Sequence, residues 1–395
     1  MSTPIALDAA RAIIAAACRP LPPERVHLAQ AHGRILRESA TTQEDIPTFH
    51  RSAFDGYALR STDAPGTLRL AMEIAAGASP IEPLQPGECA RIFTGAPLPT
   101  GADAVAMQEH CRPSAHLIEI PATAPWQGVR RRGEDATLGT VLLHRGHHLG
   151  TVETSLLAQI GHTHPLVGQR PRILHIVTGS ELVPPDETPG PGKIRDSNSA
   201  LIAGLIAESG ASLIASHRAG DDLPTLLAAL AVEPDFAWDL LLISGGASVG
   251  DYDFGARALR ELGFSIHFSQ LNLRPGKPLI FATRGHQLAF VIPGNPLSHF
   301  VCWHVAIRAA IDILLTGETS LPLIPLSAAA KLPGNPRETW WPGRLDFHEG
   351  RAIATPLNWR SSGDITGISG VNLLIQIPAA SPGIAAGEIV HALRV

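Results

Sequence analysis

The feature that most constrains this chain is a regular alternation of apolar runs and helical patterns that begins near Arg170. RILHIVTG and WDLLLISGG are almost continuously apolar before a glycine turn, whereas SNSALIAGLIAESG and LPTLLAALAV have helical spacing. Strands that are apolar along their whole length lie in parallel sheets covered on both faces, and helices connect them. We therefore expect residues 170–318 to form a central three-layer α/β domain with a mostly parallel sheet.

The rest of the sequence divides into further segments, because 395 residues exceed what one hydrophobic core usually supports. Residues 41–135 contain short apolar runs broken by Gly and Pro, which favours a β-rich insert domain. The helical pattern LDAARAIIAAA precedes this insert, and a strand-and-helix pattern follows it. Residues 1–40 and 136–169 are therefore expected to form one interrupted N-terminal domain. Residues 319–395 hold five short strand patterns, which predict a small C-terminal β-barrel.

Charge and composition exclude several classes of partner. The formal net charge is −5, and the one basic cluster is Arg130, Arg131 and Arg132, so nucleic acid is not an expected partner. The sequence lacks a basic start followed by an apolar run, and it lacks an apolar run of about 18 residues, so we expect a cytoplasmic protein without a membrane span. The four cysteines lie far apart, which argues against a zinc site or a disulfide framework.

Three glycine turns follow predicted strands of the α/β segment. In open parallel sheets the carboxyl ends of the strands meet at one edge, where glycine turns and helix N-termini accept phosphate groups. Each turn alone is as consistent with a tight turn or helix cap as with a ligand site, whereas three turns in one domain favour a shared crevice. The candidate binding residues are Thr178, Gly179, Ser244, Gly245, Gly246, Ser248, Gly250, Pro293, Gly294 and Asn295.

Carboxylates near the same strand ends predict a metal site. Glu181, Asp221 and Asp253 each lie close to the end of a predicted strand. Carboxylates beside a phosphate site usually hold Mg²⁺, which completes its shell with water and phosphate. The alternative is that Asp221, together with Asp222, caps the following helix. Sequence spacing does not decide between these two interpretations.

The segment NLRPGKP predicts a site for an oxyanion. Arg274 and Lys277 lie in a proline-rich turn whose backbone has little conformational freedom to lose. A solvated basic loop is the alternative interpretation. Three other loops, which contain Asp55, Thr94 and Asp135, combine turn residues with an acid or a hydroxyl, and spacing alone leaves their role open.

Seven motifs occur in the order in which one protein family carries them. They are SAFDGYA, TGAPLPTGADAV, RRRGED, TGSEL, GGASVG followed by Asp253, PGKP and PGNPLS. With this ordered set the sequence resembles, along almost its whole length, the molybdopterin molybdenumtransferase family, which includes bacterial MoeA and the E domain of gephyrin. The resemblance implies a four-part subunit and an elongated homodimer whose active-site cleft takes residues from both subunits.

The resemblance also implies a reaction, in which adenylylated molybdopterin and molybdate, with Mg²⁺, give molybdenum cofactor and AMP. The product would pass to the apoprotein of a molybdenum enzyme or to a cofactor chaperone. The residues implied for catalysis are Glu181, Asp221 and Asp253 toward metal and nucleotide, and Asp55, Thr94 and Asp135 on the opposite side of the cleft. The residues implied for molybdate are Arg274, Lys277, Ser298, Arg337, Ser361 and Ser362. Guanidinium, ammonium and hydroxyl groups are suitable donors to an oxyanion.

Three positions depart from the bacterial pattern of this family. Bacterial members carry lysine where this sequence has Gln270 and Arg274, and commonly an acid where it has Ser180. Arginine in place of lysine keeps the charge and changes the donor geometry, whereas glutamine removes a charge beside the oxyanion. Two alternatives follow, namely a variant that prefers tungstate, and a non-catalytic protein that binds the pterin or inserts the cofactor into an apoenzyme.

Overall fold

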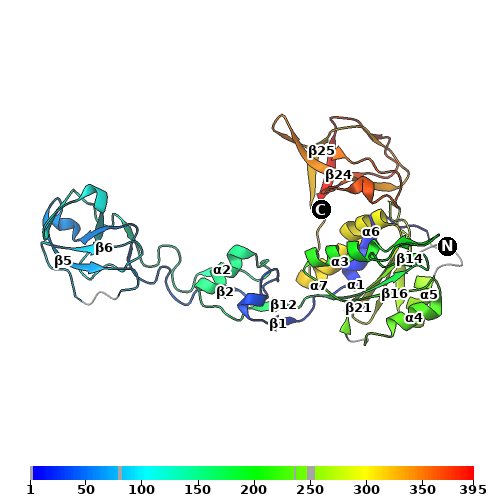
Figure 1. Cartoon of the computed structure of the whole chain (residues 1–395), viewed down its shortest axis with the longest axis horizontal. Coiled ribbons are helices and arrows are strands. Elements are labelled where there is room, and N and C mark those ends of the chain that lie inside the picture. Colours follow the sequence, from blue (N-terminus) through cyan, green and yellow to red (C-terminus); the bar gives the residue numbers. More distant parts are fainter. Residues whose placement is uncertain (1–2, 79–81, 235–236, 247–253) are drawn as a thin grey trace. The chain divides into compact units, whose positions relative to one another are not determined.

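The computed structural model describes residues 3–78, 82–234, 237–246 and 254–395. The chain divides into two compact units. The first unit consists of Met1–Arg25, Gly33–Ile35 and Leu166–Val395, and the second of Val26–His32 and Leu36–Pro165. Figure 1 shows the elements of both units.

A six-stranded sheet forms the centre of the first unit (Figure 1). Its strands are β13 (Arg172–Thr178), β16 (Ser212–Ala219), β17 (Leu240–Ser244), β18 (Ser265–Phe268), β20 (Ile280–Arg284) and β21 (Gln287–Ile292). They are ordered β16-β13-β17-β21-β20-β18, and β20 alone runs antiparallel to its neighbours. The mostly parallel sheet predicted from the apolar runs is confirmed.

Helices cover both faces of this sheet. Side chains alternate between the two faces along each strand, so each face has its own buried cluster. Leu240 and Leu242 of β17 belong to one buried cluster, whereas Leu241 and Ile243 belong to another. The first cluster includes residues of α1, α3, α6 and α7, and the second includes residues of α4 and α5. These helices are α1 (Leu7–Ala17), α3 (Asn198–Ser209), α4 (Leu223–Leu230), α5 (Phe254–Glu261), α6 (Pro296–Cys302) and α7 (Arg308–Thr316). The predicted three-layer architecture is confirmed.

Helices α6 and α7 are joined by a π-helical turn, η5 (Trp303–Ile307), into one stretch from Pro296 to Thr316. This stretch is long and apolar enough to cross a membrane, but 78% of its apolar window is buried inside the protein. Trp303 and Ile307 belong to the larger core cluster of the first unit. The stretch is therefore packed as a core helix of the α/β layer.

The sequence groups helix α1 with residues 136–169. In the structure this helix belongs to the first unit, where it packs against α7 and η5. Ile14 is fully buried in the α/β cluster, and Nη1 of Arg11 donates a hydrogen bond to the carbonyl of Val305 (2.9 Å). The apolar stripe of a helix needs a complementary surface, and here α7 provides it. The strand after it, β1 (Pro23–Arg25), pairs with β12 (Leu166–Gly168). The other predicted domain boundaries stay predictions.

The C-terminal part of the first unit is a small closed barrel. Its strands pair in the order β24-β25-β22-β28-β26, and β26 pairs again with β24. They are β22 (Leu323–Ala328), β24 (Glu338–His348), β25 (Arg351–Pro356), β26 (Leu373–Ile377) and β28 (Ile389–Arg394). A short strand from the α/β segment, β19 (Leu273–Arg274), pairs in parallel with β24. The predicted barrel is confirmed, and β19 attaches the α/β segment to it.

Short strand pairs complete the first unit, and the second unit is mainly β-structure. The pairs are β14 (Leu182–Val183) with β15 (Ile194–Arg195), and β23 (Leu332–Pro333) with β27 (Gly383–Ile384). The sheet of the second unit has the order β7-β4-β6-β5-β9-β8. Its strands are β4 (Gly56–Leu59), β5 (Gly66–Ile74), β6 (Glu88–Ile92), β7 (Ala104–Met107), β8 (Arg112–Ser114) and β9 (Leu117–Ile120). The β-rich character expected of the insert is confirmed.

The second unit also contains two strand pairs and short helices. The pairs are β2 (Ala40–Thr41) with β11 (Val141–Leu143), and β3 (Arg51–Ser52) with β10 (Val129–Arg130). The helices are α2 (Thr151–Gln159) and the 3₁₀ turns η1 (Leu28–Gln30), η2 (Ser61–Asp63) and η3 (Gln108–His110). The pairing of β2 with β11 joins the segments that precede and follow the insert.

Candidate functional site

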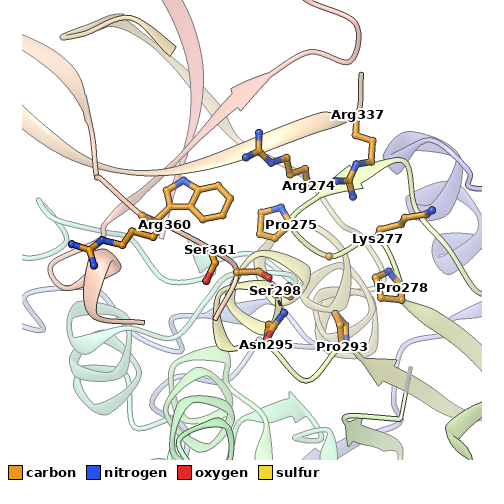
Figure 2. A pocket seen from close by; sticks show the side chains of 13 residues that line it. Arg274, Pro275, Lys277, Pro278, Pro293, Asn295, Ser298, Arg337, Arg360 and Ser361 are labelled. Carbon is orange, nitrogen blue, oxygen red and sulfur yellow. Dashed lines mark hydrogen bonds between the residues drawn. The ribbon is translucent and has the colours of Figure 1, made fainter. Parts of the chain in front are cut away.

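A pocket of about 330 Å³ lies in the first unit, where the turn after β19 meets the loop after β25 and the start of α6 (Figure 2). Its lining consists of Arg274, Pro275, Gly276, Lys277, Pro278, Pro293, Asn295, Ser298, Arg337, Trp359, Arg360, Ser361 and Ser362. Four of these side chains are cationic and, among the described residues, none of those lining the pocket is acidic. Such a concentration of one sign of charge in a concave site favours an anionic ligand.

The basic turn at this pocket is packed against α6. Arg274 lies at the end of β19, in register with Thr339 of β24. Gly276 has a φ of +102°, and a Cβ at this position would lie 2.5 Å from Sγ of Cys302. Only glycine combines this backbone conformation with so close an approach to the helix. Lys277 is exposed, so the turn is packed through its backbone while its ammonium group is free to meet a ligand.

Two arginines are directed to the pocket by contacts with neighbouring groups. The guanidinium carbon of Arg274 lies 5.3 Å from the centre of the Trp359 ring. Arg337 precedes β24, and its Nη1 donates a hydrogen bond to the carbonyl of Leu273 (3.1 Å). In Figure 2, Arg360 lies on the opposite side of the pocket from Lys277. Cations from three separate segments therefore surround one volume.

The loop after β25 is fastened to the start of α6. The side-chain amide of Asn295, which caps α6, donates to Oγ of Ser362 (2.7 Å), and the amide of Leu297 donates to the carbonyl of Ser362 (3.1 Å). Ser298, on the first turn of α6, is buried and lines the pocket. Hydroxyl groups from the loop and from the helix thus share one site, although they come from different domains.

Asp364 orders the same loop from within. Its carboxylate accepts hydrogen bonds from the hydroxyl of Thr366 (2.7 Å) and from the amides of Gly367 (2.9 Å) and Arg360 (3.1 Å). These bonds, with that of Thr366 the largest contribution, hold the pKa of Asp364 below its usual value. The ionised carboxylate therefore stabilises the loop that carries Arg360 into the pocket.

Six residues predicted for an oxyanion line this one pocket. They are Arg274, Lys277, Ser298, Arg337, Ser361 and Ser362. Sequence reasoning missed Trp359 and Arg360, which line the pocket with them. The available signal was the run WRSSG, in which an aromatic residue and a cation directly precede the serine pair.

Gln270, which the sequence places beside the expected oxyanion site, does not line this pocket. This residue is buried, with 6% of it exposed. Its backbone carbonyl accepts a hydrogen bond from the backbone amide of Ile5 (3.1 Å). The bridge between Ile5 and Leu271 holds this segment under the N-terminus. Arg274 therefore lines the pocket, whereas Gln270, close to it in sequence, does not.

Two glycine turns meet at the carboxyl ends of the parallel strands. Ser244 of β17 is in register with Ile292 of β21. Gly245 has a φ of +97°, and a Cβ there would lie 2.4 Å from Oγ1 of Thr178. A Cβ added to Gly294 would lie 4.0 Å from Cα of Gly245, so the turn that contains Pro293, Gly294 and Asn295 adjoins the turn that contains Ser244, Gly245 and Gly246. Glycine is required at position 245, because its φ is positive and a Cβ there would also lie 2.9 Å from the backbone carbonyl oxygen of Thr178.

The turn after β13 lies at the same edge. Oγ1 of Thr178 donates to the carbonyl of Ser244 (3.3 Å). Gly179 follows with a φ of +153°, and a Cβ there would lie 3.1 Å from Oε1 of Glu181. The predicted residues Ser248 and Gly250 lie outside the described residues. The described residues of the three predicted turns are thus brought to one edge of the sheet.

The predicted metal-binding carboxylates are only partly described, since Asp253 lies outside the described residues. Oδ2 of Asp221 accepts a hydrogen bond from the amide of Ser180 (2.6 Å). Asp222 is the residue that caps α4, because its Oδ1 accepts from the amide of Thr225 (2.8 Å). Within the described ranges, no three His, Cys, Asp or Glu side chains are grouped as a metal site. The helix cap that the sequence left open thus belongs to Asp222, and Asp221 bonds to the turn after β13.

In the second unit, Asp55 and Thr94 lie together. Oδ1 of Asp55 accepts hydrogen bonds from both the amide and the hydroxyl of Thr94 (2.8 Å each). These two bonds, the amide first, hold the pKa of Asp55 below its usual value. Asp135 instead pairs with Arg130, whose Nη2 lies 2.6 Å from Oδ1 of Asp135. Asp135 is exposed, and Asp55 is partly exposed.

Comparisons with known proteins cover nearly the whole chain. Residues 5–161 match the family model for the MoeA N-terminal region (domain I and II), residues 175–312 match that for a probable molybdopterin binding domain, and residues 325–395 match that for the MoeA C-terminal region (domain IV). The matches to the N-terminal and C-terminal regions of MoeA flank the match to the molybdopterin binding domain.

Relatives and solved structures agree with the family models. The molybdopterin molybdenumtransferase of Nostoc sp. is 34% identical, with 94% of this chain and 88% of that protein covered. The protein of the same name from Bacillus subtilis is 31% identical, with 94% and 90% covered. The crystal structure of the molybdopterin biosynthesis MoeA protein from Pyrococcus horikoshii OT3 is similar with a TM-score of 0.80, at 26% identity and 100% coverage of both chains.

Proposed function

The chain belongs to the molybdopterin molybdenumtransferase family and is a transferase of molybdenum cofactor biosynthesis, and from this premise we propose that it inserts molybdate into adenylylated molybdopterin with release of AMP. The observation that carries this proposal is the cationic pocket beside the glycine turns. Molybdate is a tetrahedral dianion, which guanidinium, ammonium and hydroxyl donors bind well.

The two predicted binding regions adjoin each other through Asn295. This residue lines the oxyanion pocket, and it also follows Gly294 in the turn that approaches Gly245. A pterin nucleotide bound to the glycine turns would therefore lie next to an oxyanion bound in the pocket. Holding both reactants in place replaces a bimolecular encounter with a reaction inside one complex, which is a large source of catalysis. The cations then stabilise charge without a covalent intermediate on the protein.

Magnesium is part of this proposal, with Glu181, Asp221 and Asp253 as its candidate ligands. Carboxylate oxygens are the donors that Mg²⁺ prefers, and the described pair, Glu181 and Asp221, adjoins the turn after β13. When bound, the ion neutralises phosphate charge during release of AMP. The hydrogen bond from Ser180 fixes one oxygen of Asp221 and leaves the other for a ligand.

We further propose that the active form is a cytoplasmic homodimer in which Asp55, Thr94 and Asp135 reach the cleft of the partner subunit. The support is that these three residues are polar, accessible and belong to the second compact unit, away in sequence from the α/β motifs. The cofactor formed would then pass to a molybdenum enzyme or to a cofactor chaperone. Sedimentation of the purified protein at several concentrations measures the oligomeric state directly.

The proposed activity is tested by incubating the purified protein with adenylylated molybdopterin, Mg²⁺ and molybdate, and measuring AMP. Release of AMP that saturates with molybdate is the expected result. A parallel titration with tungstate measures the preference between the two oxyanions. Tight binding of the pterin nucleotide without AMP release at saturating molybdate would contradict the enzyme and favour a binding or insertion protein.

A pair of arginine variants tests whether the described pocket is the oxyanion site. Arg360→Ala removes one pocket cation, and losing a hydrogen bond to a charged group typically changes an affinity by about tenfold or more. Arg351→Ala is the matched control, because Arg351 is an exposed arginine on β25 that does not line the pocket. The KM for molybdate should rise only in Arg360→Ala. An equal KM in the two variants would place molybdate elsewhere.

A further inference from the structure

Two histidines lie buried behind the glycine turns, and the proposed reaction does not use them. His175 of β13 and His299 of α6 are both fully buried, and each places its Nε2 2.8 Å from Oγ of Ser244. The other ring nitrogens also have partners. Nδ1 of His175 lies 2.9 Å from Oγ of Ser216, and Nδ1 of His299 lies 3.1 Å from the carbonyl oxygen of Asn295.

The backbone carbonyl of Asn295 stands at one end of this chain of hydrogen bonds, and it fixes the donor and acceptor of every bond in it. The carbonyl of Asn295 only accepts, so Nδ1 of His299 carries the proton and, in a neutral ring, Nε2 accepts from the hydroxyl of Ser244. Oγ of Ser244 then accepts from Nε2–H of His175. Nδ1 of His175 is left as an acceptor, and the hydroxyl of Ser216 donates to it. The two histidines are therefore opposite tautomers.

Both rings are neutral in this arrangement. The pKa values of His175 and of His299 are lowered to about 4 by burial and, for His175, also by the neighbouring His299. Opposing contributions come from Asp196, which raises both values, and from the hydrogen bond of His299 to Asn295. The folded pKa values lie below the unfolded value of about 6.5. The contribution of the neutral pair to folding stability is therefore fully present above about pH 6.5, and it is lost as the pH falls toward 4.

We infer that His175 and His299 are positioning residues, which hold the phosphate-binding turn and the oxyanion pocket in one fixed arrangement. One end of the chain is Ser244, where the turn to Gly245 begins, and the other is Asn295, which lines the pocket and bonds to Ser362. The inference rests on the proposed function for the ligands of these two regions. The hydrogen-bond chain itself does not depend on that function.

The arrangement suits a positioning role because its centre, made of His175, Ser244 and His299, is buried. A buried hydroxyl that loses its hydrogen-bond partner still has the full free-energy cost of desolvation. The turn is therefore expected to shift until the hydroxyl forms another hydrogen bond. Ser244 has two ring nitrogens as side-chain partners, and both must be present for its hydroxyl to donate and accept. The backbone of the turn is tightly packed against Thr178, so a displaced Ser244 moves the residues proposed to meet the nucleotide.

The first test measures tautomers by NMR of the full-length protein labelled with ¹⁵N-histidine. His299 should give the Nδ1–H pattern and His175 the Nε2–H pattern, and neither should titrate between about pH 5 and 8. Ser216→Ala, which removes an exposed hydroxyl, identifies His175 by perturbing its Nδ1 signal, and His299→Gln identifies His299 by loss of its signals. Titration within this range, or the reverse tautomers, would overturn the inference.

The second test separates positioning from folding by kinetics. His299→Leu removes the group that accepts from the Ser244 hydroxyl, whereas His299→Gln supplies an amide oxygen that accepts from the same hydroxyl. We expect the KM for adenylylated molybdopterin to rise about tenfold in the leucine variant, as for a lost buried hydrogen bond, with a smaller change in kcat. The glutamine variant should recover most of the loss. His286→Gln, at an exposed histidine between β20 and β21, is the matched control.

The outcomes separate this inference from the proposed function. Equal impairment of the leucine and glutamine variants, or an unchanged KM in both, would overturn the positioning role. Absence of AMP release from the unsubstituted protein would overturn the proposed function. The NMR measurement of the tautomers would still show whether the hydrogen-bond chain exists, because it does not depend on activity. If His299→Leu does not fold, the comparison passes to His175→Gln, whose amide nitrogen can still donate to Ser244 and should preserve the KM.

Discussion

The guanidinium of Arg274 lies over the ring of Trp359, with 5.3 Å between its central carbon and the ring centre. Arg274 is held by the pairing of β19 with β24, and Trp359 lies on the loop after β25. A cation over an aromatic face is attracted by the ring quadrupole, and the contact also limits the rotamers of both side chains. The contact thereby aligns a basic residue of the α/β segment with the pocket wall formed by the barrel.

The first prediction is that Trp359→Leu weakens molybdate binding without unfolding the barrel. Leucine keeps apolar packing but has no ring quadrupole, so Arg274 loses an interaction of about 0.5–1 kcal/mol. The KM for molybdate should rise about two- to fivefold. In Trp359→Phe this KM should lie between those of the unsubstituted protein and of Trp359→Leu. Steady-state AMP release at varied molybdate measures this. An unchanged KM in Trp359→Leu would show that the ring does not orient Arg274 for the ligand.

The second prediction concerns Gln270, at a position where the family resemblance implies lysine. Because Gln270 is buried and does not line the pocket, Gln270→Lys places a cation where desolvation costs on the order of several kcal/mol. We expect a lower midpoint of thermal unfolding and no gain in molybdate affinity. Arg274→Lys, which restores lysine inside the pocket, is the matched variant and should fold normally. A lower KM for molybdate in Gln270→Lys would contradict this prediction.

The third prediction is that Thr94→Val raises the pKa of Asp55. Valine removes the hydroxyl donor and leaves the amide donor, so the pKa returns part of the way to its ordinary value of about 3.9. A depressed folded pKa gives stability that is present above the unfolded value and lost as the pH falls through the folded value. NMR titration of the Asp55 carboxyl carbon measures the shift. Thr67→Val, at an exposed position on β5, should leave it unchanged.

The fourth prediction is that Gly245→Ala destabilises the protein and lowers activity. Its φ of +97° is unfavourable for alanine, and the new Cβ would lie 2.4 Å from Oγ1 of Thr178. Strain of this kind costs about 1–3 kcal/mol. Gly204→Ala is the control, because Gly204 lies in α3 with nothing within 4 Å of an added Cβ, and alanine there should stabilise by up to about 1 kcal/mol. Urea unfolding distinguishes the two, and equal stabilities would contradict the prediction.

Periodicity and composition were sufficient for the architecture. The apolar runs at β13 and β17 predicted a parallel sheet because side chains on both faces of these strands had to be buried. The five short patterns after residue 319 predicted the barrel. The sequence predicted helix α1 but not its packing against α7 and η5, because an amphipathic stripe predicts that a partner surface exists without identifying it.

The oxyanion pocket shows the limit of sequence reasoning at a site. The motif PGKP and the turn PGNPLS indicated Arg274, Lys277 and Ser298, since their residue types and rigid backbones suit an anion. Arg360 had no such motif. It lies in the pocket because Ser362 bonds to Asn295, which is distant in sequence, and because Asp364 orders the loop.

The sequence by itself therefore determined the parallel sheet, the barrel and, through its ordered motifs, the family. The tertiary structure alone decided which cations share the pocket, that Gln270 is buried away from it, and that Asp222 rather than Asp221 caps α4. It also decided the hydrogen-bond chain through Ser244, whose histidines are far apart in sequence. The physical reason is that local patterns encode which surfaces must be buried, whereas the groups that meet across those surfaces depend on how distant segments pack.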